Sequence, residues 1–183
     1  KEKKMKKLLV VIDMQNDFLE GSLRNEEGIN IVPNVVNKIK EYKNNGHIVV
    51  ATRDTHDIAY LQSQEGKNLP VIHCVKKSDG WKINEEVNKA LGEVLVFDKP
   101  TFGSLELAYW LNDNYGNTQS ELEIEFVGVC TDICVVSNAI LIKAHLPEAK
   151  LICDASCCAG VTKESHKAAL QTMKSCQIQV IGE

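Results

Sequence analysis

The chain has 183 residues, 44% of them hydrophobic and 25% charged, a composition typical of a soluble globular protein with one domain over residues 1–183. Its formal net charge of −4 and pI of about 5.8 provide no basic surface for nucleic acid or an anionic membrane. The seven cysteines lack the spacing of a metal ribbon or a disulfide scaffold, so we expect reduced thiols and a cytoplasmic location.

Apolar, β-branched runs alternate along the chain with segments of helical spacing. The expected strands are residues 8–12, 47–51, 93–97, 121–129, 149–153 and 178–181. The expected helices are residues 30–44, 84–91, 105–111, 132–145 and 163–174. The alternation predicts a three-layer α/β fold, in which helices cover both faces of a six-stranded parallel sheet.

Three further features of the sequence bear on function. The apolar run 8–12 is too short for a signal peptide or a membrane span, so no membrane partner is expected. No Gly-x-Gly-x-x-Gly follows this first strand, which argues against dinucleotide binding. The long irregular stretch 57–79 has the length of loops that are usually functional or mobile.

Polar residues occur where the expected strands end. Asp13 follows the first strand, Asp54 and His56 follow the second, and Lys99 follows the third. Cys134 comes shortly after the fourth strand, where a helix is expected to begin. Because ligands of parallel sheets bind at the carboxyl ends of the strands, these side chains are expected to share one rim.

Asp13, Lys99 and Cys134 can form a nucleophile with its base and a cation. A carboxylate near a thiol can accept its proton, and an ammonium group lowers the pKa of a thiol. The unpaired N–H groups of a helix start also favour a thiolate. Taken singly, the aspartate could be a helix cap and the lysine a solvated side chain, so the hypothesis rests on their joint placement.

A second group of residues has the chemistry of metal ligands. Asp54 and His56 are two residues apart and point the same way in an extended segment, and Glu65 and His73 lie in the loop that follows. Carboxylates and imidazoles of this kind suit Zn²⁺, with Mn²⁺ or Fe²⁺ as alternatives. The alternative is that both histidines form only hydrogen bonds near the surface.

The turn 128–132 precedes the candidate nucleophile. Its backbone N–H groups could bind an oxyanion, or it could be an ordinary strand-to-helix turn capped by Thr131 or Asp132. Two adjacent cysteines, Cys157 and Cys158, invite a redox function, but neighbouring cysteines form disulfides reluctantly. Buried small residues are therefore the favoured interpretation of this pair.

Several motifs resemble those of the isochorismatase-like cysteine hydrolases, especially the nicotinamidase and pyrazinamidase branch. Residues 9–18 (LVVIDMQNDF) resemble the opening signature of that family, and residues 128–135 (GVCTDICV) resemble its nucleophile motif. Residues 52–56 (TRDTH) and 70–73 (PVIH) resemble its metal loop, and Lys99 stands where the family has its lysine.

This resemblance implies functional roles and a fold. It implies a catalytic triad of Asp13, Lys99 and Cys134, and an oxyanion site formed by backbone N–H groups beside a cis peptide at Val129–Cys130. The N–H groups would be those of Cys130 and Cys134, and Phe18 would pack against the substrate. The metal ligands would be Asp54, His56, Glu65 and His73. The implied fold is the isochorismatase-like hydrolase fold, which is Rossmann-like and commonly forms dimers or tetramers.

The resulting expectation is a metal-dependent cysteine amidohydrolase that deamidates a small carboxamide, most simply nicotinamide to nicotinate. Two segments depart from the family pattern. Pro70 replaces a tryptophan that nicotinamidases often carry, and residues 99–104 differ from the usual run after the lysine. The alternatives are an amidohydrolase acting on an N-carbamoyl, ureido or other small amide, a vinyl-ether hydrolase, and a non-catalytic metal or thiol protein on the same fold.

Overall fold

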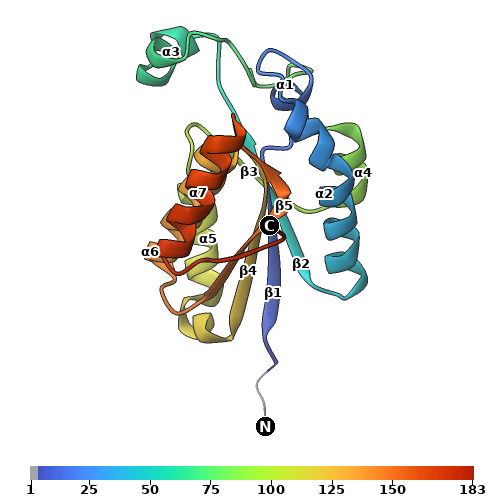
Figure 1. Ribbon diagram of the computed structural model, residues 1–183, viewed down its shortest axis with the longest axis vertical. Helices are drawn as coiled ribbons and strands as arrows, with labels where there is room; N and C mark the ends of the chain where they lie inside the picture. The colour runs from blue at the N-terminus through green and yellow to red at the C-terminus, as the bar shows by residue number, and fades with distance from the viewer. Residues whose placement is uncertain (1–3) are drawn as a thin grey trace.

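A six-stranded parallel sheet forms the centre of the molecule (Figure 1). The computed structural model describes residues 4–183, so the first three residues of the expected domain 1–183 lie outside the described residues. The strand order is β3-β2-β1-β4-β5-β6. The strands are β1 (Lys6–Ile12), β2 (Ile48–Asp54), β3 (Leu95–Lys99), β4 (Leu122–Val129), β5 (Lys150–Ala159) and β6 (Gln179–Ile181).

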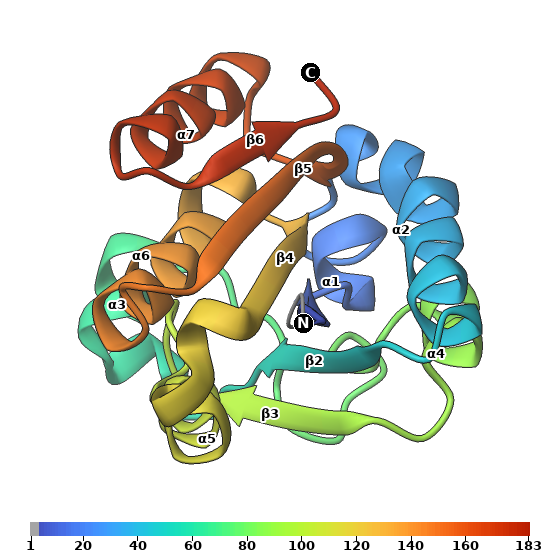
Figure 2. The same ribbon diagram turned by 90° about the horizontal axis from the view of Figure 1, so that it is seen from below.

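Helices cover both faces of this sheet, as Figures 1 and 2 show. One face carries α2 (Glu26–Asn44) and α4 (Glu85–Leu91), and the other carries α5 (Leu105–Tyr115), α6 (Val136–His145) and α7 (Lys163–Ser175). The short helices α1 (Asn16–Leu19) and α3 (Gln64–Asn68) lie beyond one end of the sheet. Short turns of 3-10 helix span Tyr60–Gln62 and Gly116–Glu121, and a π-helical turn spans Thr131–Val135. The predicted three-layer α/β fold is confirmed.

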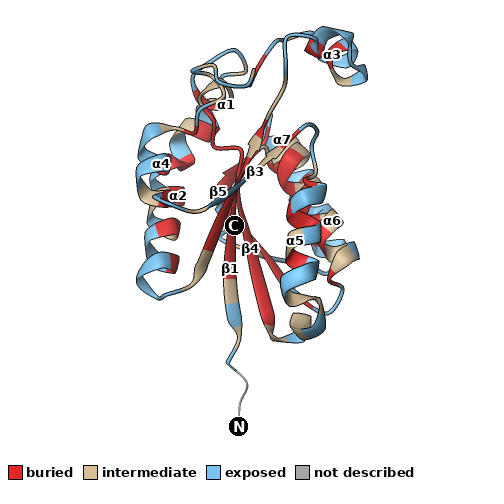
Figure 3. Cartoon of the chain, turned by 180° about the vertical axis from the view of Figure 1, so that it is seen from behind, coloured by how far each residue is buried: buried red, intermediate tan, exposed pale blue. Residues whose placement is uncertain are grey.

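Two separate apolar cores fill the spaces between the sheet and its helices. Along β1, Leu8, Val10 and Ile12 face the core under α5, α6 and α7, whereas Leu9 and Val11 face the core under α2 and α4. A strand with both faces covered is expected to be apolar without interruption, which explains the buried run in this strand. Figure 3 shows the buried strands between partly exposed helices. No helix of the described residues is long and apolar enough to cross a membrane.

Several element boundaries differ from the sequence-based expectation. β3 spans Leu95–Lys99 instead of residues 93–97, so Lys99 is the last residue of the strand. β5 spans Lys150–Ala159 instead of residues 149–153, because its pairing with β4 shifts at an irregularity and then resumes. The longer β5 contains Cys157 and Cys158, whose side chains belong to the two opposite cores. Their favoured interpretation as buried small residues is confirmed.

Two loop regions also contain more structure than expected. α2 begins at Glu26 instead of residue 30, since the Asn25 side chain accepts a hydrogen bond from the N–H of Gly28 and caps the helix. Within the irregular stretch 57–79, α3 and the preceding 3-10 turn form a short helical projection (Figure 1).

The strand order places a topological switch point beside β1. The chain proceeds from β1 to β2 and β3 on one side, then returns to add β4 on the other side of β1. Ligands of open α/β sheets bind at such a point, outside the carboxyl ends of the strands. Asp13 follows β1 and Cys134 follows β4, so the two candidate residues leave the sheet on either side of the switch point.

Close backbone approach between β1 and β4 requires glycine at position 128. Gly128 pairs with Ile12, has a φ of +121°, and a Cβ atom there would lie 2.1 Å from the carbonyl oxygen of Ile12. Gly46, after the end of α2, also has a positive φ of +69°, but a Cβ atom there would meet nothing within 4 Å.

We expect Gly128→Ala to lower the free energy of unfolding by about 3 kcal/mol or more, because both backbone strain and a steric clash oppose it. Gly46→Ala should lower it by only about 1 kcal/mol, the usual penalty for a left-handed residue. Guanidinium denaturation of both variants measures the difference. Equal losses would contradict the close approach of the two strands.

Candidate active site

A buried lysine joins a carboxylate and a thiol at the switch point. Lys99 Nζ lies 2.6 Å from Asp13 Oδ2 and 3.2 Å from Cys134 Sγ, and it also donates a hydrogen bond to the carbonyl oxygen of Thr101. The exposed fractions of Asp13, Lys99 and Cys134 are 0%, 1% and 5%. The structure therefore brings together, away from water, the three residues that the sequence proposed as a triad.

Local backbone geometry orients the carboxylate. Asp13 has a positive φ of 51° directly after β1, and its N–H donates to the carbonyl oxygen of Thr52. The Thr52 hydroxyl donates a 2.7 Å hydrogen bond to Asp13 Oδ1, while Lys99 occupies the other carboxylate oxygen. Both oxygens of the carboxylate thus have fixed partners.

The thiol lies in a π-helical turn between β4 and α6. The N–H groups of Ile133 and Val135 both donate to the carbonyl oxygen of Cys130, which closes the turn around Cys134. The peptide bond Val129–Cys130 is cis. A π turn holds one more residue per turn than an α-helix, and such turns are frequent at functional sites.

Burial changes the expected ionisation of the thiol. The sequence predicted that a helix start would favour a Cys134 thiolate, but burial and the negative charge of Asp13 raise the pKa of Cys134 well above its ordinary value, and Lys99 only partly opposes this. Burial also raises the pKa of Asp13, against the effect of Lys99. Burial alone would lower the pKa of Lys99, but the negative charge of Asp13 raises it well above its usual range. Burial therefore outweighs the effects of the helix start and of Lys99 on the pKa of Cys134, which favours the thiol as the form from which Asp13 would accept a proton.

Four side chains at the end of β2 form a group that can hold a divalent metal ion. One ligand atom from each of Asp54, His56, Glu65 and His73 lies within 4.8 Å of all the others. His56 Nε2 lies 2.8 Å from Asp54 Oδ2 and 3.7 Å from Glu65 Oε1, and His73 Nε2 lies 3.2 Å from Asp54 Oδ2. The structure thus brings together all four residues that the sequence proposed as metal ligands.

The hydrogen bonds of this group fit a cation at its centre. His73 Nδ1 lies 2.7 Å from the carbonyl oxygen of Val71, so this nitrogen carries a proton, and in the neutral ring Nε2 has a lone pair directed at the carboxylate of Asp54. Two acceptors at that distance repel each other unless a positive charge lies between them. The buried Asp54 Oδ1 also has no hydrogen-bond partner among the described residues. Two imidazoles and two carboxylates are a donor set that suits Zn²⁺ and related ions.

The helical projection supplies the outer wall of this group. Ser63 caps α3 by accepting a hydrogen bond from Gly66 N, which places Glu65 in the first turn. The Tyr60 ring packs against both histidine rings, with ring centroids 4.7 Å from His56 and 4.9 Å from His73. Tyr60 therefore orients both imidazoles from one side.

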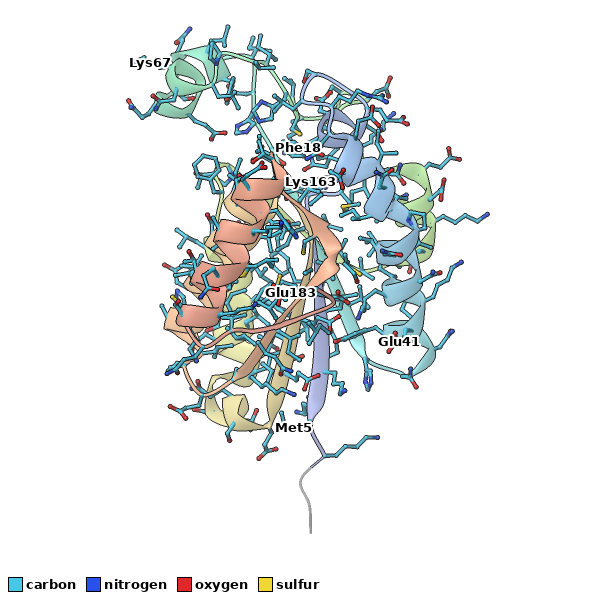
Figure 4. The ribbon with its side chains drawn as sticks, in the orientation of Figure 1. Met5, Phe18, Glu41, Lys67, Lys163 and Glu183 are labelled. Atoms are coloured by element: carbon cyan, nitrogen blue, oxygen red, sulfur yellow. The ribbon has the colours of Figure 1, made fainter. Side chains whose placement is uncertain are left out.

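A cavity of about 700 Å³ opens onto both groups. Cys134, Asp54 and His73 line it, and the Phe18 ring packs against His73 with centroids 5.6 Å apart. Figure 4 shows Phe18 at the same end of the molecule as α3. The apolar wall of the cavity comes from six side chains, namely Phe18, Leu23, Leu69, Phe102, Ile133 and Val161. Such a space, apolar with a few convergent polar groups, suits a small organic molecule.

Several residues that sequence reasoning missed hold these groups in place. Gln15 is fully buried, and its side chain pairs with both the N–H and the carbonyl of Asp54. Thr52 orients Asp13, and Asn138 donates to the carbonyl oxygen of Cys134. The only sequence feature that could have pointed to Gln15 is its position inside the 9–18 motif. The contact of Thr52 with Asp13 arises from the pairing of β1 with β2, which the sequence does not show directly.

We expect His73→Asn to weaken Zn²⁺ binding at least about 100-fold, since even outer partners of metal ligands are worth that much. His145→Asn, at the end of α6 and in contact with Tyr109, is the matched control and should bind like the wild type. Equilibrium dialysis against Zn²⁺ with measurement of bound metal tests both. Stoichiometric binding by His73→Asn would remove this residue from the metal site.

Comparison with known proteins is consistent with this architecture. A family model described as the isochorismatase domain matches residues 7–182. The crystal structure of the pyrazinamidase of Pyrococcus horikoshii in complex with zinc is 26% identical, has a TM-score of 0.77, and aligns over 97% of this chain and 99% of that chain. The crystal structure of the nicotinamidase PncA from Bacillus subtilis is also 26% identical, with a TM-score of 0.80 over 97% of this chain and 99% of that chain. A protein of Arabidopsis thaliana named "Probable inactive nicotinamidase" is 27% identical over 181 residues, which are 91% of this chain and 87% of the relative. Because the family model covers nearly the whole sequence, the chain belongs to the isochorismatase domain family.

Proposed function

We propose that this protein is a metal-dependent cysteine amidohydrolase that converts nicotinamide to nicotinate and ammonia. The observation that carries the proposal is the contact of Lys99 with both Asp13 and Cys134 beside a group able to hold a metal ion. The relatives named for nicotinamidase and pyrazinamidase activity support the choice of substrate. Zinc as the ion, a homo-oligomeric assembly and a cytoplasmic location belong to the same proposal.

The first half of the reaction forms a thioester. Asp13 accepts the proton of the Cys134 thiol while Lys99 stabilises the negative charges, and the thiolate attacks the carboxamide carbon. Backbone N–H groups of Cys130 and Cys134 would hold the oxyanion, which in comparable sites contributes on the order of 3 kcal/mol. When the intermediate collapses, the C–N bond breaks and Asp13 returns its proton to the nitrogen, which leaves as ammonia.

The second half regenerates the enzyme. A water molecule takes the place of ammonia, and Asp13 accepts its proton as the oxygen attacks the thioester carbon. The C–S bond then breaks, the acid is released, and Asp13 returns its proton to the sulfur of Cys134. One carboxylate can serve as base and then acid in both halves, because its burial raises its pKa toward that of the groups it exchanges protons with.

The remaining residues bind and orient the substrate. Phe18 would pack against the pyridine ring, and Asp54, His56, Glu65 and His73 would hold the metal ion. When bound, this ion would supply a positive charge that positions the ring nitrogen or a water molecule at the end of the cavity.

Only one of the two departures from the family pattern reaches the cavity directly. Phe102, from the segment 99–104, is a lining residue, whereas Pro70 is not among the described residues that line the cavity, although Leu69 is. The change at Pro70 is thus compatible with a ring-shaped substrate, and the segment 99–104 is the part of the site most able to alter selectivity.

We expect Cys134→Ala to lower ammonia release from nicotinamide by at least about 10⁴-fold, as for other enzymes that lose their nucleophile. The fold should remain intact, because the change only removes one sulfur atom. Cys176→Ala is the matched control, since Cys176 is the exposed cysteine, and it should keep full activity. Full activity in Cys134→Ala would exclude the covalent mechanism. Absence of turnover in the zinc-loaded wild type would favour another small amide or the non-catalytic alternative.

The pH dependence should respond to the hydrogen bond between Thr52 and Asp13. Asp13 must be ionised to act as a base, so kcat/KM falls as the pH drops through its raised pKa. The Thr52 hydroxyl stabilises the carboxylate and lowers its pKa. Thr52→Val keeps the shape but removes this bond, so the acid limb should move to higher pH. A pH profile of kcat/KM for both proteins measures the change, and an unmoved limb would show that another group titrates there.

A further inference from the structure

A single buried amide connects the nucleophile turn with the segment 99–104. Asn138, in the first turn of α6, has an exposed fraction of 0%. Its Nδ2 donates hydrogen bonds of 2.8 Å to the carbonyl oxygen of Cys134 and 3.1 Å to that of Phe102, and its Oδ1 accepts a 2.9 Å hydrogen bond from Ser104 N. All three partners are backbone atoms, and two of them belong to the segment that departs from the family pattern.

This segment carries one catalytic group and one wall of the cavity. Lys99 begins it, Phe102 lines the cavity near its middle, and Ser104 caps α5 at its end. Lys99 is held by β3 and by its contacts with Asp13 and Cys134. Phe102, in contrast to the buried Lys99, is 42% exposed, so packing against neighbouring side chains holds it only in part. The backbone of Phe102 is held by the hydrogen bond that Asn138 donates to its carbonyl oxygen, and that of Ser104 by the bond that its N–H donates to Asn138.

The chemistry of asparagine suits this task. A side-chain amide presents two N–H donors and one acceptor in a fixed plane, so it can serve two carbonyl groups and one N–H at once. Serine has a single hydroxyl donor, which on a helix usually bonds to the carbonyl four residues earlier. At this position that carbonyl belongs to Cys134. Asn138→Ser should therefore keep the bond to the nucleophile turn and lose the two bonds to the segment 99–104.

We infer that Asn138 is a positioning residue that sets the selectivity of the cavity for planar rings. It acts through the backbone of Phe102, which it holds at a fixed place relative to Cys134. The inference rests on the proposed function as far as it concerns turnover. The inferred role of Asn138 is in binding the ring and not in the chemical steps. All three of its hydrogen bonds go to backbone atoms, and none goes to the side chain of Lys99 or Asp13.

A double-mutant cycle in the zinc-loaded enzyme tests the inference. Asn138→Ser and Phe102→Ala should each raise KM for nicotinamide about 10-fold, the effect of losing a buried interaction, and change kcat by less than about threefold. If both act through the same wall, the double variant should have a KM close to that of the worse single variant. A KM raised about 100-fold, the product of two independent effects, would overturn the inference, as would a loss confined to kcat.

Two controls separate positioning from a general loss of stability. Ile142→Ala removes a fully buried side chain one turn further along α6 and should lower Tm without changing KM. Asn114→Ser makes the same replacement at an exposed position of α5, where the asparagine bonds only to the carbonyl four residues earlier, and should change neither quantity. If Ile142→Ala raises KM as much as Asn138→Ser does, the effect of Asn138 is one of stability and the inference fails.

A readout without substrate keeps the inference testable if nicotinamide is not turned over. Cys134 is alkylated with iodoacetamide and with N-benzyl iodoacetamide, and the ratio of the two rates is compared among the variants by peptide mass spectrometry. The ratio of aromatic to small reagent should fall in Asn138→Ser and in Phe102→Ala, fall no further in the double variant, and stay constant in Ile142→Ala. An unchanged ratio in Asn138→Ser overturns the inference. A fallen ratio with no turnover of nicotinamide would instead count against the proposed substrate alone.

Discussion

The buried ammonium group of Lys99 is the constraint on which the rest of the site depends. Removing a charge from water costs several kcal/mol, and the cost is recovered only when opposite charges and hydrogen-bond acceptors surround it. Here Asp13 lies 2.6 Å away, and Cys134 and the carbonyl oxygen of Thr101 each lie 3.2 Å away. Loss of the Asp13 carboxylate would leave the ammonium charge without its nearest counter-charge in the core. The same arrangement therefore fixes the thiol of Cys134 close to the carboxylate of Asp13.

Asp54 links this cluster to the group that can hold a metal ion. Its Oδ1 lies 3.8 Å from Lys99 Nζ, and its Oδ2 contacts the Nε2 atoms of His56 and His73. Burial by itself would raise the pKa of Asp54, but with no metal ion between them the Nε2–H groups of His56 and His73 donate hydrogen bonds to its carboxylate, and these hold its pKa well below its usual range. Gln15 clamps its backbone from the other side. The charge of a cation bound beside Asp54 would act on Lys99 and Asp13, so metal binding would change the ionisation of Asp13.

The sheet brings these groups together by its topology. Asp13, Asp54 and Lys99 stand at the ends of β1, β2 and β3, and Cys134 follows β4, so four adjacent parallel strands deliver them to one rim. The charged side chains at this rim are buried but paired with one another, while the apolar middle of each strand is buried on both faces. Thr52 orients Asp13 through one hydrogen bond, and Asn138 joins the turn of Cys134 to the segment 99–104 through three.

The sequence by itself determined the class of fold and the membership of the candidate site. Apolar runs alternating with helical spacing specify a parallel α/β sheet, and the residue types at the strand ends predict a nucleophilic thiol, a base, a cation and metal ligands. It did not determine the ionisation of Cys134, because desolvation depends on what packs around the sulfur. It also did not reveal Gln15, Thr52 or Asn138 as partners, since neutral polar residues carry no distinctive pattern along a chain. Their roles arise from contacts between segments 34 to 39 residues apart, which only the tertiary structure creates.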